Sequence, residues 1–227
     1  MVTGLPQAGA PTLHYIYDPL CGWCYGAAPL IQAARKVLKV RAHGGGMMAG
    51  ANRQPVSPQL RQYVMQHDRR IAQLTGQPFG DAYFNGLLLD TTAVLDSAPP
   101  IAAMLAAEEL AGKGLDMLAH LQTAHYVEGQ RVADQGVLLD QAARIGLDPA
   151  AFAVALANAC GAAVQNHIAE TRALMARTGQ QGFPSLLLEH SDGMEAVPVS
   201  PYMGKPEAFA NMLREHKAVK APQNAPA

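Results

Sequence analysis

The chain reads LHYIYDPLCGWCYG from Leu13 to Gly26. The first five residues are mostly aromatic or β-branched, which favours a strand, and an Asp-Pro step closes that strand with a turn. Cysteines follow at Cys21 and Cys24. From there to about Leu38, apolar residues recur at steps of three and four, which is typical of a helix with one buried face. The stretch therefore predicts a strand, a cysteine pair and a helix that begins at the pair.

The position of the two cysteines points to thiol–disulfide exchange. The thiolate is the reactive form of cysteine, and the unpaired N–H groups and dipole of a helix N-terminus stabilise an anion. We expect Cys21, at or before the first turn, to be the nucleophile. Cys24 lies one turn further and is expected to resolve the mixed disulfide between Cys21 and a substrate. The Cys21–Cys24 pair is then a redox-active disulfide, and we expect no bound cofactor.

Two other interpretations of the pair are a metal half-site and a local structural disulfide. Zinc would need two further thiol or imidazole ligands at a compact spacing, and the chain offers only the scattered His14, His43 and Cys160. We therefore expect no metal. Cys160 could be a second redox centre or a site of regulatory oxidation, but its alanine-rich surroundings favour a small buried or half-buried residue.

The rest of the chain predicts strands at both ends and helices between them. We expect Pro29 to kink the first helix. A second strand is predicted at Lys39–His43, a helix from Ser57-Pro58 to Gly76, and a hairpin in which Asp192-Gly193 forms the turn. The other expected helices are Ile101–Ala111, Leu115–Glu128, Asp134–Ile145, Pro149–Ala157, Gly161–Thr178 and Pro206–Lys217, and the hairpin strands are Ser185–Glu189 and Glu195–Val199.

This order of elements predicts an α/β fold in which a mixed sheet is interrupted by an all-helical insertion. The expected domains are residues 1–55 together with 179–227, and an inserted helical domain over 56–178.

The composition and charge of the chain limit the kinds of partner that it is expected to bind. The chain has 227 residues, 49% of them hydrophobic, and a formal net charge of −1, which fits a globular protein. Its basic residues are scattered, so we expect neither nucleic acid nor membrane as a partner. The N-terminus shows no secretion signal and the apolar stretches are too short for a transmembrane helix, which favours a cytoplasmic location. The residues after Lys217 are expected to be a disordered tail.

The cysteine segment resembles the active-site segment of the thioredoxin superfamily. Two further matches resemble the DsbA family in particular: Gly182-Phe183-Pro184-Ser185 is similar to its cis-proline loop, and the stretch from His125 to Gly129 with Asp134 is similar to part of its helical domain. The FrnE-like branch, predicted to be protein-disulfide isomerases, looks most similar. The resemblance covers roughly residues 12–217 and implies an oxidoreductase or isomerase that acts on protein or small-molecule thiols and disulfides, with glutathione as a candidate co-substrate.

The resemblance also assigns roles around the cysteines. It implies that Pro184 is a cis-proline facing the pair and that the backbone of Phe183 pairs with an extended substrate. Trp23 is a further candidate for substrate binding. Met47 and Met48 are either core residues, which is the commoner role of methionine, or lining for a substrate groove with Trp23 and Phe183.

One residue departs from the family pattern. Thioredoxins and periplasmic DsbA proteins have a buried carboxylate six residues before the first cysteine, and this chain has Tyr15 there. Asp18 is the nearest acid. It is either a proton relay for the cysteines or an ordinary turn residue, and the sequence favours neither.

Two rival functions fit the same layout. Kappa-type glutathione transferases and chromene-carboxylate isomerases share it, but they usually have serine in place of the first cysteine. A cytoplasmic adaptor, with Cys21 and Cys24 as redox sensors, is the third hypothesis.

Overall fold

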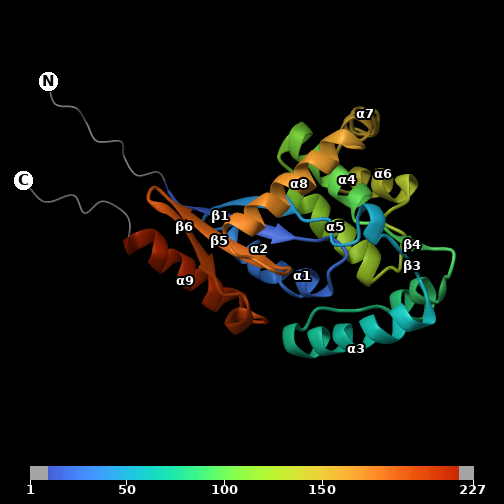
Figure 1. The fold of residues 1–227 in the computed structure, drawn as a ribbon, viewed down its shortest axis with the longest axis horizontal. Helices are drawn as coiled ribbons and strands as arrows, with labels where there is room; N and C mark the ends of the chain where they lie inside the picture. Colours follow the sequence, from blue (N-terminus) through green and yellow to red (C-terminus); the bar gives the residue numbers. More distant parts are fainter. Residues whose placement is uncertain (1–9, 220–227) are drawn as a thin grey trace, which may run out of the picture.

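A four-stranded mixed sheet forms the base of the fold. The structure is a computed structural model that describes residues 10–219. The strands are arranged in the order β2-β1-β5-β6, with β1 (Thr12–Tyr17), β2 (Lys39–Gly44), β5 (Ser185–His190) and β6 (Gly193–Val197). β1 pairs parallel with β2 and antiparallel with β5, and β5 pairs antiparallel with β6 (Figure 1). The predicted α/β class and mixed sheet are confirmed.

The hairpin differs from the prediction by a shift of one or two residues. His190 pairs with Gly193, so Ser191 and Asp192 form the turn instead of Asp192 and Gly193. The second strand ends at Val197, before the expected Val199. Pro198 accounts for the early end, because proline has no N–H to donate to a strand partner.

The first helix is two short helices, not one kinked helix. α1 spans Gly22–Gly26 and α2 spans Ala28–Ala34, and Ala27 ends the first and precedes the second. Pro29 lies in the first turn of α2, where a missing N–H breaks no helical hydrogen bond. The expected kink at Pro29 is therefore wrong, as is the expected extension of the helix to Leu38.

The middle of the chain is helical, as predicted. In α3 (Pro58–Thr75) the Ser57 hydroxyl accepts a hydrogen bond from the Leu60 N–H at 3.1 Å, and Gly76 ends the helix with φ 74°. These are the expected start and end. The other helices are α4 (Ala98–Ala111), α5 (Gly114–Tyr126), α6 (Gln135–Arg144), α7 (Pro149–Ala159), α8 (Ala162–Arg177) and α9 (Pro206–Val219).

Several short elements in this region have no counterpart in the prediction. β3 (Gln54–Pro55) pairs antiparallel with β4 (Val94–Leu95), and a π-helical turn η2 (Ala82–Gly86) leads into the 3-10 turn η3 (Leu87–Leu89). Two further 3-10 turns are η1 (Gly50–Asn52) and η4 (Ser200–Tyr202). Segments of two to five residues are too short to show a hydrophobic period, so sequence pattern does not reveal them. The domain boundaries at 55/56 and 178/179 stay a prediction.

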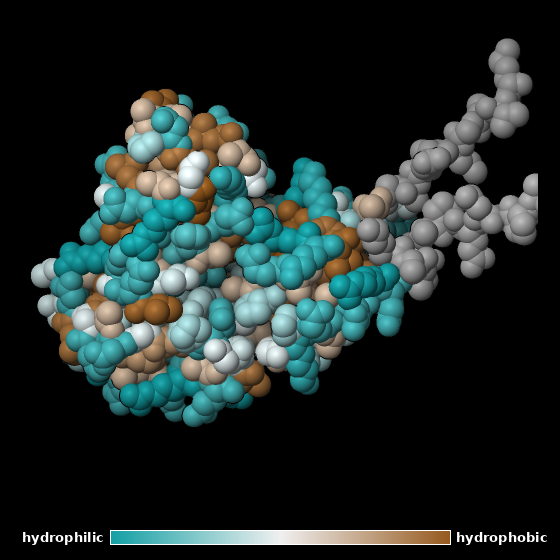
Figure 2. Space-filling model, turned by 180° about the vertical axis from the view of Figure 1, so that it is seen from behind, coloured by the Kyte–Doolittle hydropathy of each residue, from teal (hydrophilic) through white to brown (hydrophobic). Residues whose placement is uncertain are grey.

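The helices cover the sheet unequally. α4 to α7 gather beyond the β2 edge, α8 runs back across the sheet, and α3 lies beside α1 (Figure 1). Tyr15 and Tyr17 of β1 are buried in the main core with Leu30 and Phe209, whereas Ile16 packs in a smaller cluster with α8. The face in Figure 2 mixes hydrophilic and hydrophobic residues, with brown residues gathered on the upper lobe. Within residues 10–219, no helix combines the length and hydrophobicity that crossing a bilayer requires.

A substitution at Phe209 would test how α9 packs against α2 and the main core. It is fully buried, so truncation to alanine removes an aromatic ring from the core and leaves a cavity. We expect Phe209→Ala to lower the free energy of unfolding by about 3–5 kcal/mol, measured by denaturant titration. Tyr63→Ala is the matched control, because Tyr63 is 64% exposed and its loss should have little effect. Equal effects of the two substitutions would contradict this packing.

Candidate active site

The two cysteines lie where β1 gives way to α1. Cys21 has extended backbone geometry and is the N-cap of α1, and Cys24 lies in the first turn. Cys21 is 7% exposed and Cys24 is completely buried; both are free thiols. The N–H groups of Cys24 and Tyr25 both donate to the Cys21 carbonyl, which fixes the turn. Cys21 is thus the more accessible of the two thiols.

The second part of the site arrives from the far end of the sequence. The Phe183–Pro184 peptide bond is cis, which confirms the expected isomer. The Cys21 thiol lies 3.6 Å from the Phe183 carbonyl oxygen, to which it donates. Because Ser185 of β5 pairs with Ile16 of β1, the residues just before β5 and just after β1 meet at one end of the sheet.

The environment of Cys24 separates the roles of the two thiols. Burial raises the pKa of the Cys24 thiol well above its usual range, and the neighbouring Cys21 raises it further. The Asp18 N–H, 3.5 Å from the Cys24 sulfur, acts in the opposite direction but does not compensate. At neutral pH Cys24 therefore stays protonated, which makes it a weak nucleophile until the reaction activates it.

Asp18 is buried and its carboxylate is held by three donors. The Leu20 N–H and the Ser97 hydroxyl donate to Oδ1, both at 2.9 Å, and the Met47 N–H donates to Oδ2 at 2.5 Å. Burial raises the pKa of Asp18, while these donors and the charge of Arg172 lower it in part. The carboxylate ties the cysteine loop to the loop after β2 and to the start of α4. These contacts are those of an anchor, and a relay role for Asp18 stays a prediction.

Tyr15 occupies the place of the missing family carboxylate. Its hydroxyl donates to the Cys24 carbonyl oxygen at 3.3 Å. Burial, with the nearby thiols, raises the pKa of Tyr15 well above its usual range, so the hydroxyl keeps its proton. Tyr15 cannot act as a buried carboxylate would.

Two cavities flank Trp23. One, of about 630 Å³, is lined by Cys21, Trp23, Met47 and Met48 together with residues of α3. The other, of about 310 Å³, contains Trp23, Phe183 and Pro184 with Arg70, Ser200 and neighbouring residues. The predicted groove residues therefore all line cavities, but Phe183 and the two methionines lie in different ones.

Sequence pattern missed Asp68, which lines the larger of these two cavities. It is 4% exposed, and its Oδ2 accepts a hydrogen bond from the Tyr83 hydroxyl at 2.9 Å. Asp68 lies four residues after Val64 and three before Ile71, so it shares their face of α3. An acid at helical spacing between apolar residues was the signal that the sequence offered.

Other residues considered from sequence lie outside the site. His14 is hydrogen-bonded to His43 and to Glu189, both at 2.9 Å, and burial lowers the pKa of His43 to about 4. Cys160 is exposed, which corrects the expectation of a buried or half-buried residue, because it is the C-cap of α7 and lies beyond the buried residues of that helix. Across residues 10–219 there is no group of three or more potential metal ligands.

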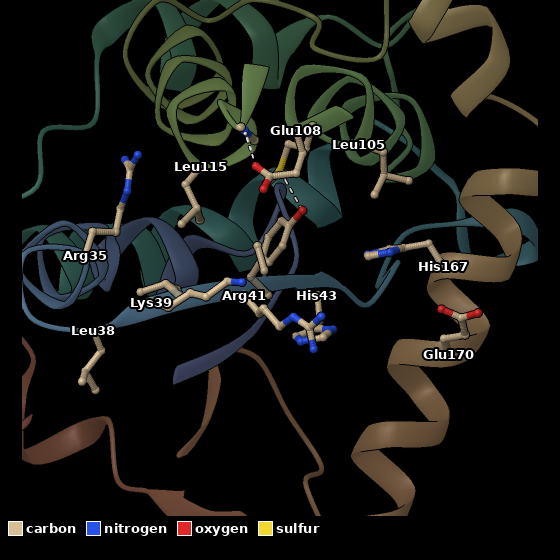
Figure 3. Close-up of a pocket in the computed structure, with 16 residues that line it drawn as sticks. Arg35, Leu38, Lys39, Arg41, His43, Leu105, Glu108, Leu115, His167 and Glu170 are labelled. Atoms are coloured by element: carbon tan, nitrogen blue, oxygen red, sulfur yellow. Dashed lines mark hydrogen bonds between the residues drawn. The ribbon is translucent and has the colours of Figure 1, made fainter. Parts of the chain in front are cut away.

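A further cavity, of about 680 Å³, lies along the free edge of β2 (Figure 3). Lys39, Arg41 and His43 of β2 face it, with Glu108 from α4 and His167 from α8. Neither cysteine lines it, so its size alone does not make it the site of thiol chemistry.

Comparison with known proteins identifies the family. The family model described as a DSBA-like thioredoxin domain matches residues 12–202. The chain belongs to the DSBA-like thioredoxin domain family. No match was found among the curated proteins.

Solved structures of other members support this assignment. The chain is 53% identical to the cytosolic disulfide reductase DsbM from Pseudomonas aeruginosa, with a TM-score of 0.87, covering 92% of this chain and 99% of that one. A structure of DsbM with GSH gives 52% identity, a TM-score of 0.84 and coverage of 90% and 98%.

More distant structures share the fold alone. A protein from Nitrosomonas europaea is 24% identical, with a TM-score of 0.77 and coverage of 94% and 100%. A 2-hydroxychromene-2-carboxylate isomerase is 17% identical, with a TM-score of 0.58 and coverage of 92% and 99%. The family model and the 53% identity to DsbM, rather than these distant structures, show that this DSBA-like chain is a thiol–disulfide oxidoreductase with a CXXC pair, as the sequence predicted.

Asp18→Asn tests the anchor in this DSBA-like site. An amide in place of the carboxylate directs an N–H₂ group toward donors and removes a charged acceptor. We expect a loss of about 1.5–3 kcal/mol in the free energy of unfolding, measured by denaturant titration. Ser97→Ala, which removes one of the three donors, should lower stability by only about 1 kcal/mol. A neutral effect of Asp18→Asn on stability would contradict the anchoring role.

Proposed function

We propose that this protein is a cytoplasmic disulfide reductase that takes its electrons from glutathione. In this proposal Cys21 is the nucleophile and Pro184 faces the pair. Cys24, the resolving thiol expected from sequence, acts only when no external thiol reaches the mixed disulfide on Cys21. The observation that carries the proposal is the placement of the Cys21 thiol at the α1 N-terminus, against the Phe183 carbonyl and in the wall of the cavity of about 630 Å³. DsbM is a cytosolic protein, which supports a cytoplasmic location for this one. DsbM is also a disulfide reductase, which supports thiols and disulfides as the substrates.

The reaction begins with attack by the Cys21 thiolate on a substrate disulfide. One substrate thiol leaves, and Cys21 remains joined to the other sulfur. A second thiolate then attacks this mixed disulfide and releases Cys21. Either Cys24 performs this step and forms the Cys21–Cys24 disulfide, or an external thiol performs it directly.

The burial of Cys24 supports an external thiol. A buried thiol with a raised pKa gives little thiolate at neutral pH, so resolution by Cys24 is slow unless its proton is removed. A small thiol that enters the cavity beside Cys21 does not meet this barrier. The DsbM structure with GSH supports glutathione as that thiol.

The cavity that contains Pro184 offers groups suited to glutathione. Trp23 and Phe183 provide apolar contact, as expected of substrate-binding residues, and Arg70 and Ser200 provide donors for a carboxylate. Glutathione carries two carboxylates. We therefore assign one of them to Arg70.

Cysteine variants test the roles of the two thiols. We expect Cys21→Ser to abolish glutathione-dependent reduction of a mixed disulfide between glutathione and a small thiol. Cys24→Ser should keep most of that activity, because the external thiol resolves Cys21 directly. The assay measures formation of oxidised glutathione, and Cys160→Ser is the control because that exposed thiol lines neither cavity beside Trp23.

The rival functions give other results in this assay. An adaptor would show no turnover in any variant and would keep its partner when both Cys21 and Cys24 are serine. A kappa-type transferase would conjugate glutathione to an electrophile without forming oxidised glutathione.

Arg70→Ala tests the assigned carboxylate contact. Loss of an exposed ion pair is worth up to about 1 kcal/mol, so we expect the KM for glutathione to rise roughly 5-fold with little change in kcat. Arg69→Ala is a matched control, since the neighbouring Arg69 lies over the Phe84 ring, 5.9 Å from its centre. If both variants change KM equally, Arg70 does not bind glutathione.

A further inference from the structure

The redox cavity contains a carboxyl group to which the reaction above gives no task. Asp68 lines the cavity of about 630 Å³ together with Cys21. One carboxyl oxygen, Oδ2, accepts from Tyr83, and no hydrogen bond to Oδ1 forms within residues 10–219. An acid held on one side and free on the other is able to exchange a proton with a molecule in the cavity.

The absence of a side chain at Gly22 lets the Asp68 carboxyl group lie against the start of α1. A Cβ atom at Gly22 would lie 2.4 Å from Asp68 Oδ1 and 3.1 Å from a methyl group of Ile71. Any other residue at this position would force α3 or the carboxyl group away. The free oxygen of Asp68 therefore lies against the residue bonded to Cys21, in the wall of the cavity that Cys21 also lines.

The surroundings leave the charge of Asp68 finely balanced. The titratable groups around it are Cys21 at the start of α1, Tyr83 of η2 and Tyr126 of α5, together with Tyr63 and His67 of α3 in the same cavity wall. No lysine or arginine lines this cavity among the described residues. Burial raises the pKa of Asp68 to about 7, and the Tyr83 hydrogen bond opposes the shift. Both the protonated and the ionised form are present near neutral pH, as acid–base catalysis requires.

We infer that Asp68 is the catalytic acid and base for the substrate thiols that leave from and arrive at Cys21. This inference rests on the proposed glutathione reaction. Asp18, with three donors on its carboxylate, and Tyr15, whose hydroxyl keeps its proton, are unsuited to the task. The family has a buried carboxylate where this chain has Tyr15. Here the carboxyl group of Asp68, on α3, takes the proton-transfer task instead.

The two half-reactions balance with one carboxyl group. First, the Cys21 thiolate attacks the glutathione sulfur of a mixed disulfide; the S–S bond breaks, and the departing thiolate takes the proton of the Asp68 carboxyl. Second, a new glutathione gives its proton to the Asp68 carboxylate, and its sulfur attacks the glutathione sulfur bound to Cys21. Oxidised glutathione leaves, and the Cys21 thiolate and the protonated Asp68 are restored. The net change is one mixed disulfide and one glutathione converted into one free thiol and oxidised glutathione.

The first test compares two kinds of leaving group in single turnovers of the reduced protein without glutathione. An alkyl thiolate is basic and needs a proton as it leaves, whereas a nitro-substituted aryl thiolate is stable without one. We expect Asp68→Asn to slow reduction of bis(2-hydroxyethyl) disulfide by about 100-fold, and reduction of 5,5′-dithiobis(2-nitrobenzoate) by less than about 3-fold. Equal slowing of both would overturn the inference.

The pH dependence gives the second test. In the wild-type protein, the rate at which glutathione discharges the Cys21 mixed disulfide should rise through pH ~7, where Asp68 ionises. In Asp68→Asn the rise should come only near pH ~8.5, where a free thiol ionises. Tyr83→Phe removes the hydrogen bond that lowers the Asp68 pKa, so its inflection should move above that of the wild type. An inflection that is the same in all three proteins would overturn the inference.

Stability separates this role from a structural one. A carboxyl whose pKa is raised from about 4 in the unfolded chain makes the folded state less stable as pH rises from ~4 through ~7. Asparagine does not titrate, so the Tm of Asp68→Asn relative to wild type should increase between pH 5 and pH 8. A lower Tm at both pH values, with equal loss on both disulfides, would indicate a packing role and overturn the inference. Wild-type turnover with glutathione is scored separately: its absence would overturn the proposed function, while the single-turnover comparison would still test Asp68.

Discussion

The antiparallel pairing of β1 with β5 is the constraint on which the site depends. Ile16, near the end of β1, lies opposite Ser185 at the start of β5. The chain that leaves β1 toward Cys21 and the chain that enters β5 through Pro184 must therefore meet at one end of the sheet. The intervening helices return the chain to this point, so a separation of 162 residues becomes a contact of 3.6 Å between Cys21 and the Phe183 carbonyl.

Two buried carboxyl groups near this contact behave differently because their hydrogen bonds differ. Both have pKa values raised by burial. The Asp18 carboxylate accepts hydrogen bonds from three segments of the chain, which fixes its position and leaves no oxygen free for substrate. The Asp68 carboxyl group accepts one hydrogen bond and borders a cavity. A buried acid with all its acceptors occupied holds structure together, whereas one with a free oxygen facing a cavity is available for chemistry.

The sequence predicted the parts of the fold that carry periodic patterns. The four strands, the cysteine pair at a helix start, the caps at Ser57 and Gly76 and the run of helices all follow from local chemistry. Pro29 was misjudged because the same residue kinks a helix from within and opens one in its first turn, and only the break at Ala27 distinguishes the cases. The sequence marks Asp68 only as an acid among apolar residues of α3, because its place beside Cys21 depends on α3 packing against α1, a tertiary contact that no local pattern specifies.

The dipeptide between the cysteines gains a structural meaning from these contacts. In the fold, Gly22 is the gap that admits the Asp68 carboxyl, since a Cβ atom there would collide with it. Trp23 separates the cavity that holds Asp68 from the one that holds Arg70 and Pro184. A small residue followed by a large one thus places Asp68 in one cavity and Arg70 in the other. In the reaction that we propose, proton transfer and glutathione binding therefore both depend on positions 22 and 23.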